Sequence, residues 1–217
     1  MTPDYNKAAT KAMETLINNK ICETPISPLP ILKKMQGVIV LSFAEMSTLT
    51  DIDRSSLVAM FGENQDAASF YINKGKIKYV VAYNQRLPFY ILHKGLSREL
   101  GHIVLGHDGT RPEEIRSAEA YCFAHHLLCP RPLIKAIQDA NIKLTIETIR
   151  NLTGCDERCL ARMKKEPGAI VAPELNRKVK EQFREHVENL LEFQRVLSIN
   201  DPSYLADLGD YMNNYSE

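Results

Sequence analysis

The segment RELGH, residues 98–102, carries residue types and a spacing that suit metal-assisted hydrolysis. On a helix, positions four apart lie about 40° apart around the axis, so their side chains can reach one ion. Zinc sites with the pattern His-Glu-x-x-His use this geometry, and the Glu activates a zinc-bound water. Here Glu99 and His102 occupy the second and fifth positions, whereas Arg98 occupies the first.

Arg98 is incompatible with the role of its position in that pattern. A guanidinium has no lone pair to donate and stays charged in proteins, so it cannot bind zinc. It also places a positive charge where a dication would lie. The remaining Glu-x-x-His is common on helix surfaces, so the interpretation depends on the flanking sequence.

Two flanking motifs make the pattern specific. They are ELGHIVLGH at residues 99–107 and EAYCFAHHLLCP at residues 119–130. Together they resemble the ImmA/IrrE family, whose members carry patterns like HELGHILLGH and EANxFAxxLLMP. The second motif matches in register at Glu119-Ala120, Phe123-Ala124, Leu127-Leu128 and Pro130, and departs from the family at Tyr121 and Cys129. The resemblance covers roughly residues 5–165.

The resemblance implies a minimal zincin-like metallopeptidase fold with zinc as its cofactor. It implies that Glu99 is the catalytic residue and that His102 and Glu119 are zinc ligands. Family members act as cytosolic proteases that cleave a helix-turn-helix repressor, which relieves repression of mobile-element or stress-response genes. Arg98 stands where the pattern has its first histidine, which would be a zinc ligand. Only two protein ligands therefore remain, whereas catalytic zinc sites normally have three. We therefore expect zinc to be absent or weakly bound.

Other side chains could in principle replace the missing ligand. His93 lies nine residues before His102, on the opposite face of the helix. His107 is rotated by about 140° from His102 and follows Gly106. Two histidines and a cysteine belong to the Glu119 helix, namely Cys122, His125 and His126. We interpret all of these as structural residues.

The predicted elements are helical at both ends, with a small sheet near the start. Apolar residues at helical spacing predict helices, and β-branched runs beside Gly predict strands. The predicted helices cover 3–20, 30–36, 87–107, 111–130, 131–141, 145–154, 155–167 and 173–199, and the strands 37–43, 67–75 and 76–84. Residues 51–62 are expected to contribute another short strand. A hairpin turn is predicted at Lys74-Gly75-Lys76, where Gly suits the turn.

This order of elements predicts an α+β fold with a small, antiparallel-rich sheet packed on helices. We expect a peptidase-fold domain over residues 1–167, followed by a C-terminal extension of a long helix and a tail over residues 168–217. The apolar spacing of the long helix is not sustained over enough heptads for a coiled coil, so packing on the core is favoured. A weak helix-turn-helix sequence pattern occurs at residues 145–163.

Composition restricts the possible functions. Lys plus Arg and Asp plus Glu each number 27, so the chain has no basic excess for general nucleic-acid or anionic-membrane binding. The five cysteines are odd in number and form no regular framework, which is typical of reduced thiols in the cytosol. The start of the chain has no secretory signal pattern, and its longest apolar runs are too short to span a membrane. We expect a cytoplasmic protein without a membrane partner.

Three functions follow from these observations. The favoured one is a metallopeptidase-like protein with a degenerate zinc site, which regulates a mobile element or stress response through a repressor-like protein partner. The alternatives are an active metallo-endopeptidase that cleaves a helix-turn-helix repressor, and a non-enzymatic DNA-associated regulator. For the favoured function we expect Arg98 to take over the electrostatic role of the ion by binding Glu119, because Glu99 diverges from Arg98 by about 100° around the helix.

Overall fold

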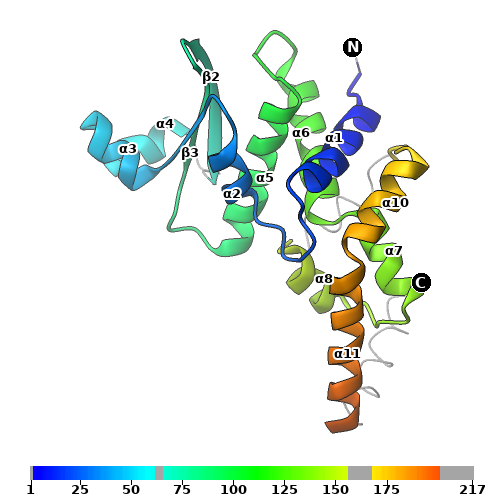
Figure 1. The fold of residues 1–217 in the computed structure, drawn as a ribbon. Helices are drawn as coiled ribbons and strands as arrows, with labels where there is room; N and C mark the ends of the chain where they lie inside the picture. The colour runs from blue at the N-terminus through cyan, green and yellow to red at the C-terminus, as the bar shows by residue number, and fades with distance from the viewer. Residues whose placement is uncertain (1, 62–65, 156–167, 201–217) are drawn as a thin grey trace.

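The computed structural model describes residues 2–61, 66–155 and 168–200, which form an α+β fold (Figure 1). The strands are β1 (Val38–Ser42), β2 (Ala67–Lys74) and β3 (Ile77–Tyr83). The helices are α1 (Tyr5–Asn18), α2 (Pro28–Lys34), α3 (Phe43–Thr50), α4 (Arg54–Phe61), α5 (Phe89–Val104), α6 (Glu113–Leu128), α7 (Arg131–Asp139), α8 (Ile146–Thr153), α10 (Pro173–Gln182) and α11 (Arg184–Asn200). The predicted fold class is confirmed at this level.

The sheet is small and mixed, with the strand order β1-β3-β2. The predicted hairpin is confirmed, since β2 and β3 pair antiparallel and Gly75 adopts φ +63° in the turn between them. β1 pairs parallel with β3, from Val38 opposite Tyr79 to Ser42 opposite Tyr83. Antiparallel pairing was expected to predominate in the sheet, but among the described strands it occurs only in the hairpin. This order leaves β2 at an edge of the sheet.

The strand predicted within residues 51–62 is wrong, because this part of the chain forms helix α4, directly after the unpredicted helix α3. Ser42 and Glu45 form a capping box at the start of α3, with each side chain accepting a hydrogen bond from the other residue's backbone amide. Asp53 caps the start of α4 by accepting from the Ser56 amide at 3.0 Å. These helix-start signals outweigh the β-branched content of the segment.

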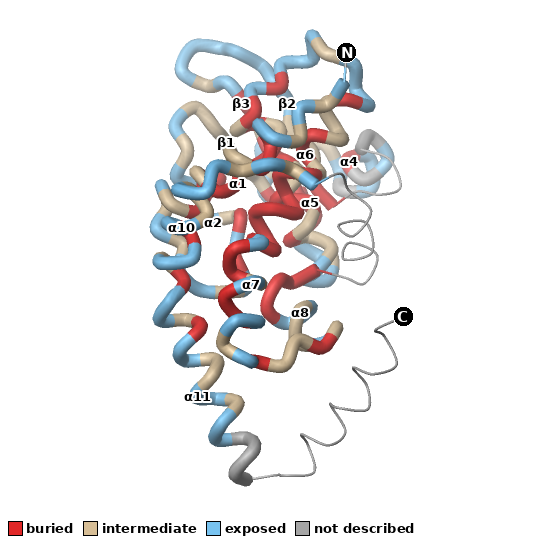
Figure 2. Tube along the Cα trace, turned by 90° about the vertical axis from the view of Figure 1, so that its right-hand side faces the viewer, coloured by how far each residue is buried: buried red, intermediate tan, exposed pale blue. Residues whose placement is uncertain are grey.

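Helices α5 and α6 form the centre of the core and carry the zinc-motif residues. Figure 2 shows the buried chain concentrated in these helices. Gly101 lets them approach closely: a Cβ there would lie 3.0 Å from the Ala120 carbonyl oxygen and from the Phe123 ring. Helices α3 and α4 lie on the other side of the sheet, where Phe43, Leu57 and Ala82 form a second, smaller cluster.

The predicted long C-terminal helix is two helices, α10 and α11, separated at Phe183. The predicted packing of this region on the core is confirmed, since Val179 and Phe183 are fully buried and α10 contacts α1 and α7. The Gln182 side-chain amide also donates to the Leu16 carbonyl at 3.0 Å. Most of α11 extends beyond the core (Figure 1).

Several interpretations fall on residues 156–167, which lie outside the described part of the chain. These are the predicted helix at 155–167, Cys159, and most of the second half of the helix-turn-helix pattern at residues 145–163. None of the four described cysteines forms a disulfide. Among the described helices, none combines the length and apolar composition that a bilayer-spanning segment requires.

Candidate functional site

Arg98 lies at the centre of a salt-bridge network between α5 and β2. Its Nε and Nη2 atoms lie 2.9 and 2.8 Å from Glu99 Oε1, and Nη2 also lies 3.1 Å from Asp66 Oδ1. Nη2 further donates to the Ala67 carbonyl oxygen at 2.9 Å, and the guanidinium lies 5.7 Å from the centre of the Tyr121 ring. The Arg98 side chain is only 20% exposed. The guanidinium is therefore bound by two carboxylates and a carbonyl rather than by solvent.

The expected contact between Arg98 and Glu119 is wrong. Arg98 binds its sequence neighbour Glu99 instead, because its long side chain bends back across the angle that separates the two residues on the helix. Asp66 approaches from before β2 and packs against Gly95, where a Cβ would lie 2.5 Å from the Asp66 carboxyl carbon. The glycine one turn before Arg98 thus makes room for the second carboxylate.

Glu99 is buried, and hydrogen bonds occupy both of its oxygens. Oε1 accepts from Arg98, and Oε2 accepts from the Ser69 hydroxyl at 2.6 Å. Burial raises the pKa of Glu99, while Arg98 and Ser69 act in the opposite direction. For Arg98, burial alone would lower the pKa, but Glu99 and Asp66 outweigh it and raise the pKa above its ordinary value. Arg98 is therefore held in its charged form.

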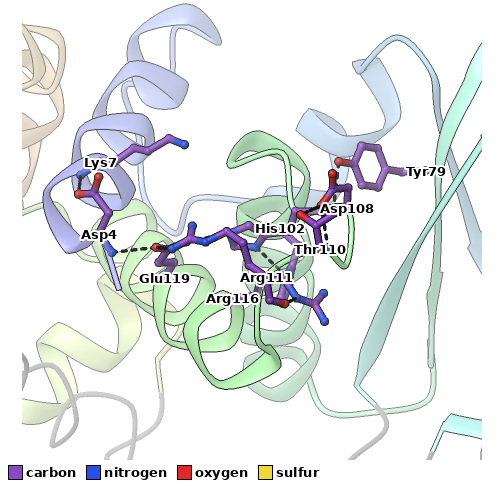
Figure 3. A network of polar contacts seen from close by, with 10 residues as sticks. Asp4, Lys7, Tyr79, His102, Asp108, Thr110, Arg111, Arg116 and Glu119 are labelled. Carbon is purple, nitrogen blue, oxygen red and sulfur yellow. Dashed lines mark hydrogen bonds and ion pairs between the residues drawn. The ribbon is translucent and has the colours of Figure 1, made fainter. Parts of the chain in front are cut away.

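Glu119 has a different arginine partner, Arg111, from the loop before α6. Arg111 binds it with two parallel hydrogen bonds, Nη1 to Oε2 and Nη2 to Oε1, both at 2.8 Å (Figure 3). The Asp4 amide donates to Oε1 at 2.8 Å, and His107 Nε2 lies 3.0 Å from Oε2. Burial alone raises the pKa of Glu119, but these hydrogen bonds outweigh burial and lower it. Both oxygens of the carboxylate are therefore occupied by partners within the chain.

The two histidines of the motif form a short relay to Glu119. His102 Nδ1 and His107 Nδ1 are 2.9 Å apart, a distance at which one nitrogen must donate and the other accept. Burial lowers the pKa of His102 to about 4 and also lowers that of His107, so both rings are neutral at pH 7. If His107 donates from Nε2 to the carboxylate, His102 donates from Nδ1 and keeps a lone pair only on Nε2.

These donors do not fit a catalytic zinc ion. Of the three positions in the family pattern, Arg98 has no lone pair and Glu119 is saturated by Arg111, His107 and Asp4. Of the three, only His102 retains a free donor atom. In the described part of the chain, no group of three or more His, Cys, Asp or Glu residues is arranged to hold a metal ion. The two predicted carboxylates, Glu99 and Glu119, are thus each bound by an arginine of the chain, and His102 is linked to Glu119 through His107.

Sequence reasoning missed Arg111, Asp66 and Ser69, and assigned no contact to His107. Arg111 lies eight residues before Glu119, in a loop whose path is set by Gly106 and Gly109, both with positive φ. No periodicity indicates which acid a loop arginine will meet. Gly95, in contrast, is a signal in the sequence. A glycine inside a helix lowers helix stability by about 1 kcal/mol relative to alanine, so its presence indicates that another group packs closely at that position.

A cleft of about 550 Å³ lies beside this network. Its lining comes from β2, β3, α5, α6, the loop between α5 and α6, and Phe43 at the start of α3. Its polar lining residues are Ser69, Tyr71, Tyr79, Arg98, Glu99, His102, His107, Asp108, Glu113, Arg116, Ser117 and Tyr121. Glu119 is not among the lining residues. The cleft is thus bordered by the edge strand of the sheet and by the degenerate motif.

The other candidate ligands lie apart from this cleft. Cys122 and His126 are buried on α6, and His125 is buried beside them. His93 is 3% exposed, its ring centre lies 4.6 Å from that of Phe89, and its Nε2 has no hydrogen-bond partner among the described residues. None of these residues lines the cleft, and their interpretation as structural residues stays a prediction.

His93 should make the fold sensitive to acid. Burial lowers its pKa to about 4, although a hydrogen bond with the Ile26 backbone partly opposes this. The unfolded chain takes up this proton near pH 6.5, whereas the folded chain does so only near pH 4. Stability is complete above pH 6.5 and falls as the pH drops, by up to about 3 kcal/mol from this group.

Urea unfolding of the parent and a His93→Gln variant between pH 7 and pH 4 measures this contribution. Glutamine can still donate to a carbonyl but does not titrate in this range. The free energies of unfolding should converge as the pH falls. A constant difference between the two proteins across the range would contradict the assignment to His93.

Comparisons with family models, curated proteins and solved structures give no match for this chain.

Proposed function

We propose that this chain is a zincin-like protein that has lost zinc chemistry and binds a segment of a protein partner in the cleft beside its degenerate motif. One observation carries the proposal: both carboxylates of the motif have an arginine of the same chain as partner. Arg98 holds Glu99, and Arg111 holds Glu119. The charge that an ion would neutralise in an active relative is neutralised here without one.

The edge strand supports a polypeptide as the ligand. β2 borders the cleft through residues 67–71 and pairs with β3 on one side only in the described sheet. An edge strand presents free backbone donors and acceptors that an extended segment can pair with. The end of β3, at Tyr83 and Asn84, offers no second place for strand addition, because both residues are buried and β3 is the central strand.

The resemblance to the ImmA/IrrE family supports the kind of partner. By analogy the partner is a helix-turn-helix repressor, and the chain acts as a cytoplasmic antirepressor of a mobile element or a stress response without cleaving it. Nothing in the arrangement of the described residues favours a DNA-binding function. The proposal therefore combines a regulatory role with binding in place of hydrolysis.

Selection of peptides from a random linear phage-displayed library tests this function. The parent should enrich peptides that bind it but lose affinity for a Ser117→Trp variant, because Ser117 lines the cleft and tryptophan fills it. Circular dichroism and thermal unfolding establish that the variant is folded. Each peptide should also remain intact, by mass spectrometry, after incubation with the parent and zinc.

Two results would contradict the proposal. If no peptide binds the parent better than Ser117→Trp, the cleft is not a polypeptide site. If peptides are cleaved and a Glu99→Gln variant abolishes the cleavage, the chain is an active peptidase and the site works despite Arg98.

A further inference from the structure

The charged side chains that line the cleft are paired, with one exception among the described residues. Arg98 is bound by Glu99, and Arg116 is bound by Glu113. Asp108 lines the same cleft and is exposed, and within the described chain it forms no ion pair. Its Oδ1 accepts from the Thr110 amide at 3.0 Å and from the Thr110 hydroxyl at 2.7 Å. These bonds leave Oδ2 available. Arg116 attracts Asp108 but lies beyond ion-pair distance from it and is bound by Glu113, so Asp108 presents a carboxylate oxygen to the cleft.

Two tyrosines line the cleft together with Asp108. Tyr71 and Tyr79 are opposite each other on β2 and β3, with ring centres 5.3 Å apart and planes inclined by 60°. The Tyr79 hydroxyl lies 3.4 Å from the carbonyl oxygen of His107, the residue before Asp108, and Figure 3 shows Tyr79 next to Asp108. Tyr79 is buried, whereas Tyr71 is 44% exposed and offers its ring to a ligand.

The electrostatic balance of the cleft favours a cation. Of its charged lining residues two are arginines and three are carboxylates, and Asp66 adds a fourth carboxylate behind Arg98. Hydrogen bonds from Thr110 lower the pKa of Asp108, so its carboxylate stays charged. An incoming acidic side chain would meet this excess of negative charge.

We propose that Tyr71, Tyr79 and Asp108 form a subsite for a cationic side chain, an arginine or a lysine of the polypeptide held in the cleft. The cation stacks on the exposed Tyr71 ring and pairs with Asp108. The inference rests on the proposed polypeptide-binding function and adds the chemical class of residue that the partner must supply. Because Tyr71 belongs to the edge strand, the subsite lies where a strand added to β2 would place its side chains.

Peptides from the same random library test the subsite by their composition and by a double-mutant cycle. Arginine or lysine should be enriched among peptides that the parent selects, and not among those that Asp108→Asn selects. One selected peptide is then measured by fluorescence anisotropy, with its basic residue intact and replaced by citrulline or norleucine. Asp108→Asn should weaken the intact peptide roughly fivefold and leave the neutral peptide unchanged.

Matched variants separate the ring and the charge from general effects. Tyr71→Leu should lose about as much affinity as Asp108→Asn, whereas Tyr71→Phe keeps the aromatic face and should lose less affinity than Tyr71→Leu. Glu188→Gln removes an equal charge from an exposed position on α11, outside the cleft, and should change nothing.

The outcomes distinguish this inference from the function on which it rests. Peptides that bind in the cleft, lose affinity for Ser117→Trp and show neither a basic preference nor sensitivity to Asp108→Asn would overturn the subsite alone. If the library gives no peptide that distinguishes the parent from Ser117→Trp, the polypeptide-binding function fails, and the subsite fails with it.

Discussion

Replacement of Arg98 by alanine should lower the free energy of unfolding by about 3 kcal/mol. The reason is that Asp66 and Glu99 would remain buried, 5% and 4% exposed, without their cation. Removing one partner from a buried pair leaves a charge that water does not reach, which costs more than the pair contributes on its own. Urea unfolding at pH 7, followed by circular dichroism, measures the change.

Three further variants show whether the loss has this origin. Arg98→Ala combined with Glu99→Gln should recover part of the stability, because one of the orphaned carboxylates becomes neutral. Arg98→Lys should fall between the parent and alanine, since a lysine retains the charge but not the fork of nitrogens that reaches Glu99, Asp66 and Ala67 together. Arg177→Ala removes an exposed arginine from a pair with Glu174 and should leave the unfolding midpoint unchanged. If Arg98→Ala is as stable as the parent, Arg98 does not replace an ion in this fold.

The helices and the hairpin around the site could be predicted because their signals are local. The apolar spacing in α5 and α6 and the turn glycine at Gly75 indicate structure without knowledge of the rest of the chain. Helices α3 and α4 were not predicted, although Ser42 and Glu45 form a capping box at the start of α3 and Asp53 caps the start of α4. A cap marks only the first turn of a helix, and these two short helices lack a sustained helical apolar period.

The pairing of charges at the site could not be predicted in the same way. Once the helices are known, the sequence places Arg98, Glu99 and Glu119 near one another. Which charged groups then pair depends on the residues that the loops between elements bring to them. The loop before α6 brings Arg111 to Glu119, and the start of β2 brings Asp66 to Arg98. Both contacts depend on tertiary structure. The angular positions of side chains around α5 therefore gave Glu119 as the partner of Arg98, which is wrong.

The presence of two arginines at the degenerate motif changes what is needed to restore zinc binding. Converting Arg98 to histidine supplies the missing ligand of the pattern, but Glu119 remains bound by both nitrogens of Arg111. A carboxylate held by a bidentate guanidinium is a poor ligand, because zinc would have to displace a charged partner. We therefore expect Arg98→His alone to hold well below one equivalent of zinc, like the parent.

The double variant Arg98→His, Arg111→Met should instead hold about one equivalent, with the introduced histidine, His102 and Glu119 as its three protein ligands. Methionine retains much of the arginine's apolar volume without its charge. Zinc should also raise the melting temperature of the double variant, because the ion replaces the two lost cations and binds only the folded chain. Elemental analysis after dialysis against zinc, together with the visible spectrum of the cobalt-substituted protein, measures occupancy and coordination.

A His102→Ala substitution in the double variant is the matched control and should abolish binding, since His102 is the only native residue of the set with a free donor atom. Arg111→Met alone separates the two arginines: it frees Glu119 but leaves Arg98, and should therefore bind no more zinc than the parent. Stoichiometric zinc in the parent, lost on His102→Ala, would show that the native donors suffice. If the double variant takes up no zinc while remaining folded, α5 and α6 do not present a zincin-like ligand set, and the resemblance of the two motifs does not extend to their geometry.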